Sequence, residues 1–199
     1  MSFSSAITNR TVVILSACQS PGAEMALACA RGGARVVAID NDAEGLNRLA
    51  ADCPDRIEPL SVQGNQVETL RLLKDAWGSE PIHLVVNLMP LEFPHNITEQ
   101  MRALTIIMRS MGRGLIAGKG ALVTVTARPN DPLALVEQGM CGALRSAGAS
   151  LASIFSPKSV RIHTVTVPKG NPELALETVF FLDNPQTRYL KNAEFDLSA

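Results

Sequence analysis

The chain has 199 residues, of which 46% are hydrophobic and 19% are charged, and its formal net charge is −1. This composition is typical of a globular α/β chain with a sizeable core, and we predict one domain over residues 1–199. The near-neutral charge without a Lys/Arg block argues against nucleic acid as a partner, and no apolar run reaches the ~20 residues of a membrane helix.

Short β-branched runs alternate with longer helical patterns along the whole chain. In chain order we predict a strand at 11–15, a helix at 21–31, a strand at 35–39, a helix at 42–53, a strand at 56–62, a helix at 67–77, a strand at 82–87, a helix at 97–117, a strand at 121–127, a helix at 132–156, a strand at 160–167, a helix at 172–182 and a strand at 193–197. Strict alternation with continuous apolar strands indicates a parallel sheet covered on both faces. The predicted fold class is α/β: a doubly wound, Rossmann-like parallel sheet of about seven strands, with helices on both faces.

Ligands of such sheets bind beyond the carboxyl ends of the strands. Three of these ends are the loops after Leu15, Asn87 and Ala127. These loops are therefore where we expect any chemistry.

The start of the sequence lacks the basic and apolar regions of a signal peptide. The four cysteines, Cys18, Cys29, Cys53 and Cys141, form no CxxC pair, and the three histidines lack ligand spacing. We therefore predict reduced thiols, no metal site and a cytoplasmic location.

The order of elements, the stretch "GARVVAID" and Asn87 at the end of a strand resemble the short-chain dehydrogenase/reductase family. The tail "PQTRYLKNAEFDL" is similar to that family's last strand, so the resemblance covers nearly the whole chain. It implies a Rossmann fold, a nicotinamide cofactor and a Ser/Tyr/Lys catalytic set.

The family's phosphate loop reads Thr-Gly-x-x-x-Gly-x-Gly, and this chain has "LSACQSPG" over residues 15–22. Ser16 and Ser20 replace two glycines, and only Gly22 remains. Pro21 has no N–H to offer a phosphate, although Ser20 as N-cap and Pro21 at the first helical position suit a helix start. The loop is either one that no longer binds a dinucleotide or a tolerant variant that still binds.

The other cofactor positions match the family in part. Asp40 is placed either to bond the adenosine ribose, which implies NAD, or to cap the next helix. Asn87 keeps the first position of Asn-Asn-Ala-Gly, whereas the adenine-contacting Asp falls on Gln63 and the helix asparagine falls near Glu99 or Gln100. The cofactor prediction is therefore none or weak NAD, with Ser16, Ser20, Gly22, Asp40 and Asn87 as the candidate binding residues.

The family's catalytic residues are absent from this sequence. The serine falls on Ala127, the tyrosine on Glu137 and the lysine on Cys141, and the chain's one tyrosine, Tyr189, lies in the tail. Glu137 and Cys141 share a helix face, but no histidine is close in sequence and a carboxylate raises a thiol's pKa. We therefore predict no catalytic residues.

The functional prediction is a short-chain dehydrogenase/reductase-like protein that is catalytically inactive and acts as a binding, regulatory or structural subunit. The alternatives are an NAD-dependent oxidoreductase of this type with a non-standard active site, and a small-molecule or nucleotide sensor without chemistry. Cofactor titration separates the two alternatives from the first prediction.

The long helices at 97–117 and 132–156 carry the prediction about partners. The second contains only two charges, Glu137 and Arg145, so we expect its outer face to be covered. In the family the equivalent helices form a four-helix bundle across a two-fold axis. We predict a homo-oligomer, a dimer or tetramer, through both helices, or a hetero-oligomer with an active relative.

Overall fold

The computed structural model describes residues 7–62, 69–71 and 77–197. Its centre is a seven-stranded sheet in the order β3-β2-β1-β4-β5-β6-β7, and every neighbouring pair is parallel. The predicted fold class is thereby confirmed. The strands are β1 (Thr11–Leu15), β2 (Arg35–Asp40), β3 (Ile57–Ser61), β4 (Leu84–Asn87), β5 (Ala121–Arg128), β6 (Arg161–Pro168) and β7 (Asn192–Asp196).

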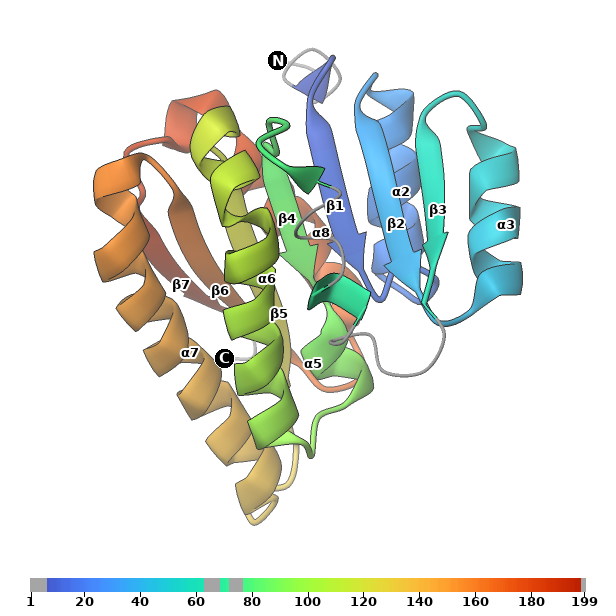
Figure 1. Cartoon of the computed structure of the whole chain (residues 1–199). Coiled ribbons are helices and arrows are strands. Elements are labelled where there is room, and N and C mark those ends of the chain that lie inside the picture. The colour runs from blue at the N-terminus through green and yellow to red at the C-terminus, as the bar shows by residue number, and fades with distance from the viewer. Residues whose placement is uncertain (1–6, 63–68, 72–76, 198–199) are drawn as a thin grey trace.

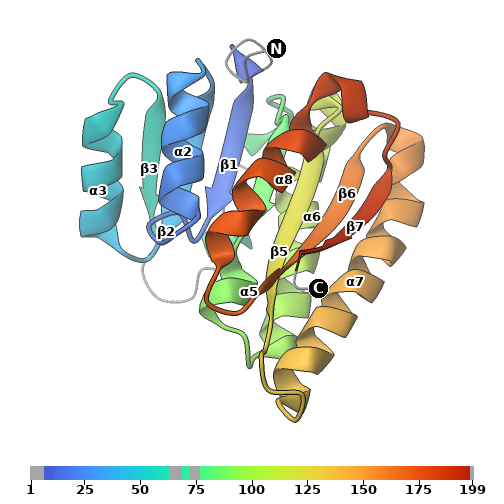
Figure 2. The same cartoon turned by 180° about the vertical axis from the view of Figure 1, so that it is seen from behind.

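Helices cover both faces of this sheet (Figures 1 and 2). One face carries α2 (Gly22–Arg31), α3 (Ala43–Asp52) and α8 (Ala175–Asp183). The other face carries α6 (Ile97–Gly118) and α7 (Leu135–Phe155), which lie side by side. The strand order reverses between β1 and β4, so the crevice of a doubly wound sheet opens beyond these two strands.

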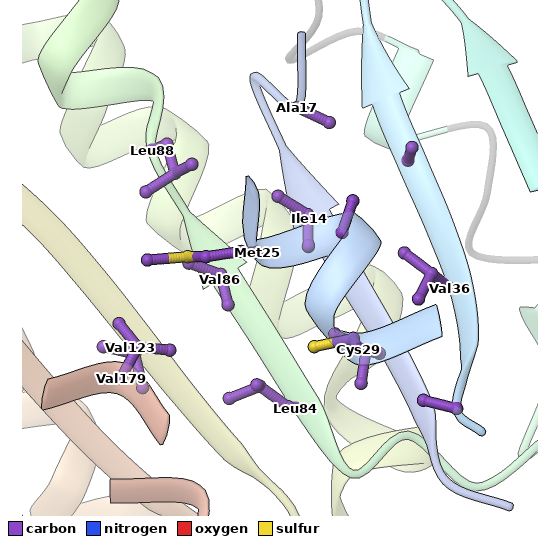
Figure 3. Packing of buried hydrophobic residues seen from close by; sticks show 14 of the residues in the cluster. Ile14, Ala17, Met25, Cys29, Val36, Leu84, Val86, Leu88, Val123 and Val179 are labelled. Atoms are coloured by element: carbon purple, nitrogen blue, oxygen red, sulfur yellow. The ribbon is translucent and has the colours of Figure 1, made fainter. Parts of the chain in front are cut away.

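The apolar strands separate two hydrophobic cores, because alternate side chains point to opposite faces of a sheet. Figure 3 shows the first, in which Met25 and Cys29 of α2 pack on Ile14, Val86 and their neighbours. In the second, Met111 of α6 and Leu144 of α7 pack on the opposite face. The central strands β1 and β4 are buried along their full length, which explains their continuous apolar sequences.

Several predicted boundaries need correction. Helix α2 begins at Gly22, with Pro21 in the capping position and no side-chain cap, so Ser20 is not the N-cap. Helix α7 begins at Leu135 rather than at 132, and a 3-10 turn (Pro172–Leu174) precedes α8. A short helix that we did not predict, α5 (Met89–Glu92), follows β4. The helix predicted at 67–77 falls largely outside the described residues.

Candidate functional site

A pocket of about 220 Å³ opens at the carboxyl edge of the sheet, at the ends of β1, β4, β5 and β6. Its apolar lining includes Leu88, Leu91 and Ala127, and its charged lining residues are Glu92 and Lys169. The predicted loops after Leu15 and Asn87 both contribute to this pocket, whereas the third predicted place contributes only Ala127 itself, which still lies in β5. The fourth loop, after β6, was not anticipated.

The loop after β1 keeps the backbone shape of a glycine-rich turn without its first glycine. Ser16 has a φ of 58°, in the left-handed region that a residue with a Cβ rarely adopts. A Cβ added at Gly22 would lie 2.8 Å from the carbonyl oxygen of Ser16 and 3.0 Å from Cα of Ala17. Gly22 is therefore needed for the close approach of α2 to β1, which is the packing role of the third glycine in this motif.

Backbone N–H groups around this turn already have partners inside the chain. The N–H groups of Gly22 and Ala23 both donate to the carbonyl oxygen of Gln19, at 2.6 Å and 3.3 Å. The N–H of Ala17 donates to Ile39, and Pro21 has no N–H. The N–H groups of Ala17, Gly22 and Ala23 are therefore engaged within the chain and are not free to bind an anion at this helix start.

Asp40, at the end of β2, is buried and holds the same loop in place. Its Oδ2 accepts a hydrogen bond of 2.8 Å from the N–H of Cys18, and its Oδ1 accepts one of 3.0 Å from the N–H of Asp42. The helix cap is Asp42, which accepts from Gly45, so the capping interpretation of Asp40 is wrong. Burial, with help from Asp40 and Asp42, raises the pKa of the Cys18 thiol to about 12.

Glu92, the last residue of α5, places a carboxyl group against the phosphate loop. The hydroxyl of Ser16 donates a hydrogen bond of 2.9 Å to its Oε2. Burial raises the pKa of Glu92, the hydrogen bond from Ser16 opposes this shift, and the Asp40 carboxylate adds to it. The first turn after β1 therefore faces a carboxyl group.

Asn87 and Gln100 are buried polar residues that both bond the backbone of Met89. Asn87 Oδ1 accepts a hydrogen bond from the N–H of Met89, and Gln100 Nε2 donates to the carbonyl oxygen of Met89. Both side chains are fully buried. Of the two positions considered for the family's helix asparagine, Gln100 is thus the one that points inward, whereas Glu99 lies in the first turn of α6 and is partly exposed.

The positions of the family's serine and lysine adjoin one another but carry no proton relay. The Cys141 thiol donates to the carbonyl oxygen of Ala127 at 3.3 Å and lies 3.5 Å from Oγ1 of Thr126. Cys141 and Thr126 are buried, and Ala127 lines the pocket with a methyl group. Cys141 therefore packs against β5 as a small side chain.

Glu137, at the position of the family's tyrosine, belongs to a cluster of three ionisable side chains. The carboxylate of Glu137, only 8% exposed, accepts hydrogen bonds of 3.1 Å and 3.2 Å from Nζ of Lys169. Nε2 of His95, from the loop before α6, lies 3.5 Å from Oε1 of Glu137. Glu137 thus connects α7 to the loops after β6 and α5.

The fold and this pocket can be compared with solved structures. A short-chain type dehydrogenase/reductase from Mycobacterium marinum aligns over 100% of this chain and 98% of its own, with a TM-score of 0.78 and 16% identity. The chain has the fold of the short-chain dehydrogenases/reductases. An oxidoreductase of this family from Burkholderia thailandensis aligns over 96% of this chain and 92% of its own, with a TM-score of 0.76 and 18% identity. The sequence matches no protein-family model and no curated protein.

From the sequence we predicted that the loops at the strand ends form the site, but we missed three ionisable residues there: Glu92, Lys169 and His95. Lys169 directly follows β6, so extending the strand-end rule to the sixth strand would have found it. Glu92 needed knowledge of α5, a single helical turn too short for a periodic pattern.

Further structural observations concern metals, cysteines and membranes. Among the residues that the structure describes, no three His, Cys, Asp or Glu side chains gather so that they could hold a metal ion. All four cysteines are free. No helix within the described ranges combines the length and apolarity needed to cross a membrane.

The outer faces of the two long helices differ from each other. The exposed residues of α7 are mostly small or apolar, and they include Leu135, Val136, Ala149 and Ile154. Most of the large apolar residues of α6 are instead buried within the chain, with Ile116 as an exposed exception. The exposed residues of α6 include Arg102, Arg109 and Arg113, so its outer face is more basic than that of α7.

Proposed function

We propose that this chain is a member of the short-chain dehydrogenase/reductase family that does not transfer hydride and acts as a binding or regulatory subunit. The observation that carries the proposal is the hydrogen bond of Ser16 to Glu92. It holds a carboxyl group at the turn where a dinucleotide of this family would place its pyrophosphate. Two negative groups at one site repel each other, and the repulsion is strong where water is partly excluded.

The remaining cofactor contacts support the same proposal. A pyrophosphate needs N–H donors, and those of Ala17, Cys18, Gly22 and Ala23 are bonded within the chain. Both oxygens of Asp40 already accept backbone hydrogen bonds, so ribose hydroxyls would compete with the loop itself. These residues fit a dinucleotide poorly, and we derive no step of chemistry through one.

The residues at the catalytic positions also lack the required acid and base. A carbonyl reduction needs a proton donor beside the substrate oxygen. In the family this donor is a tyrosine, whose pKa a nearby lysine lowers towards neutral pH. Here Ala127 has no hydroxyl, Cys141 is buried against β5, and Glu137 is engaged by Lys169. The short connection from Lys169 to the helical turn at Pro172 also leaves little chain to cover a substrate.

The test is an absorbance assay with NADH and NADPH and a panel of ketones and aldehydes. We expect no oxidation above the protein-free rate. The triple variant Glu137→Tyr, Cys141→Lys and Ala127→Ser should also fail, because the phosphate loop is unchanged. Steady turnover by the wild-type chain that a pocket substitution removes would overturn the proposal.

We further propose that the subunit assembles through the α6–α7 face, as a homo-oligomer or with an active relative. The exposed small residues of α7 permit a close approach by another helix. Gly142 has open space around its Cβ position, and Ala149 is exposed, so both point away from the sheet. The basic residues of α6 favour a partner that presents carboxylates to that helix.

A further inference from the structure

Glu92 lines the pocket but does not fill it. About 220 Å³ of space remains between the loops, enough for a small organic group rather than a dinucleotide. Only Glu92 and Lys169 contribute charged side chains to the lining. Ligand charge would therefore matter at these two side chains. Whether the pocket favours a cation or an anion depends on which of the two charges is already paired within the protein.

The charge of Lys169 is compensated inside the protein. Both carboxylate oxygens of Glu137 lie within 3.2 Å of its Nζ, and Glu137 is buried, so the pair is tightly held. Binding an anion at Lys169 would have to compete with this carboxylate. Lys169 is thus a weak site for an acidic ligand.

The charge of Glu92 is not compensated in this way. Its hydrogen-bond partner is the neutral hydroxyl of Ser16, and none of the cationic side chains in the described part of the chain forms an ion pair with it. The buried carboxylate of Asp40 is close enough to raise the pKa of Glu92 further. This end of the pocket therefore lacks a cation.

Apolar side chains make up much of the rest of the lining. Leu88 and Leu91 follow β4, and Ala127 lies near the end of β5. Apolar lining around a few polar groups is typical of a site for a small organic ligand.

We propose that this pocket binds a small organic cation, a primary ammonium on an alkyl chain, where the dinucleotide phosphate of a short-chain dehydrogenase/reductase would lie. The ammonium donates to the carboxylate of Glu92. The alkyl chain lies along the apolar lining residues Leu88, Leu91 and Ala127. The inference rests on the proposed absence of a bound dinucleotide, but it makes a separate claim about ligand charge.

The test compares n-octylammonium, octanoate and 1-octanol by calorimetric titration of the purified full chain at pH 7.5. We expect octylammonium to bind at least about ten-fold more tightly than either of the others, as one charge-assisted hydrogen bond predicts. Butylammonium should bind more weakly than octylammonium, because its shorter chain covers less of this apolar lining. Equal or tighter binding of octanoate, or no binding of octylammonium, would overturn the inference.

A matched pair of variants assigns the charge preference to its residue. Glu92→Gln keeps the shape of the side chain and should remove the preference for octylammonium over octanol. Glu177→Gln, an exposed position on α8, should leave that preference unchanged. A preference that survives in Glu92→Gln overturns the assignment. The same protein titrated with NAD separates the claims: NAD binding contradicts the proposed function, and a missing ammonium preference contradicts only this inference.

Discussion

Nζ of Lys169 lies 3.1 Å and 3.2 Å from the two carboxylate oxygens of Glu137, so an ion pair joins the loop after β6 to the first turn of α7. The two partners differ in burial, since Lys169 is 52% exposed and Glu137 is 8% exposed. Removing Glu137 leaves the ammonium of Lys169, which water can solvate. Removing Lys169 leaves the buried carboxylate of Glu137, which water cannot solvate as well, so the second removal should cost more stability.

The ion pair gives the first prediction. Lys169→Met leaves a buried carboxylate with only the exposed His95 nearby, and we expect it to lower the free energy of unfolding by about 1–3 kcal/mol. Glu137→Gln leaves a half-exposed ammonium that water can solvate, so its effect should be smaller. Urea unfolding of both variants checks the order, and a larger loss for Glu137→Gln would contradict it.

Gly22 supplies a prediction about the loop itself. Gly22→Ala would place a methyl group against the backbone of Ser16 and Ala17, which cannot yield as a flexible side chain can. We expect a loss of about 1–3 kcal/mol in the free energy of unfolding. Gly112→Ala is the matched control, because its added methyl group would make only an ordinary contact, 3.7 Å from the Phe155 ring. There we expect a gain of about 0.5–1 kcal/mol from helix propensity. Equal effects at the two sites would refute this account of Gly22.

His163 makes stability depend on pH. This residue is fully buried in β6, and burial, with a smaller contribution from Arg161, lowers its pKa from 6.5 to about 4. At this position the unfolded chain binds more protons than the folded chain between these pH values, so the contribution of His163 to stability decreases as the pH falls through this window. The full difference corresponds to about 3 kcal/mol. Asp183, whose pKa burial raises to about 6, contributes in the opposite sense, so the effect of His163 is measured by comparing a variant with the wild-type chain.

His163→Asn tests this prediction, because the amide oxygen can replace Nδ1 as the acceptor for the N–H of Ala193. Thermal unfolding followed from pH 7 to pH 4.5 should show a shallower decrease in Tm for the variant than for the wild-type chain. An identical slope in both proteins would show that another group controls this pH range.

Ala149 tests the proposed interface. Ala149→Trp adds bulk to an exposed position on α7, and it should shift an oligomer towards a monomer if this helix meets its partner there. Light scattering on a sizing column measures the change. Ala51→Trp, exposed on α3, is the control and should leave the assembly intact. A wild-type chain that elutes as a monomer of 21.3 kDa would argue against self-association.

The succession of strands and helices along the chain could be predicted from the sequence, because the apolar runs of the strands are short, β-branched and separated by helical patterns. The helix ends could not be placed as well. Ser20 and Pro21 have the residue types of an N-cap and a first helical position, but the carbonyl oxygen of Gln19 closes the turn instead. Backbone groups can replace a side-chain cap, and the residue types do not reveal such a replacement.

The candidate site could be predicted only where it follows the strand ends. The sequence alone shows that the family's motif residues are replaced at four positions, Ser16, Ala127, Glu137 and Cys141. The contacts that replace them depend on segments far apart in the chain: Glu92 lies 76 residues from Ser16, and Lys169 lies 32 residues from Glu137. Pairings over such separations depend on the tertiary structure and leave no local pattern.

The central claim is that the phosphate loop no longer binds a dinucleotide, and calorimetric titration of the purified chain with NAD and NADP tests it most directly. Glu92→Gln, titrated in parallel, shows how much of the effect the carboxyl group causes. We expect no measurable heat of binding for the wild-type chain up to millimolar cofactor, and at most weak binding for the variant. A low-micromolar dissociation constant for NAD or NADP with the wild-type chain would contradict the account.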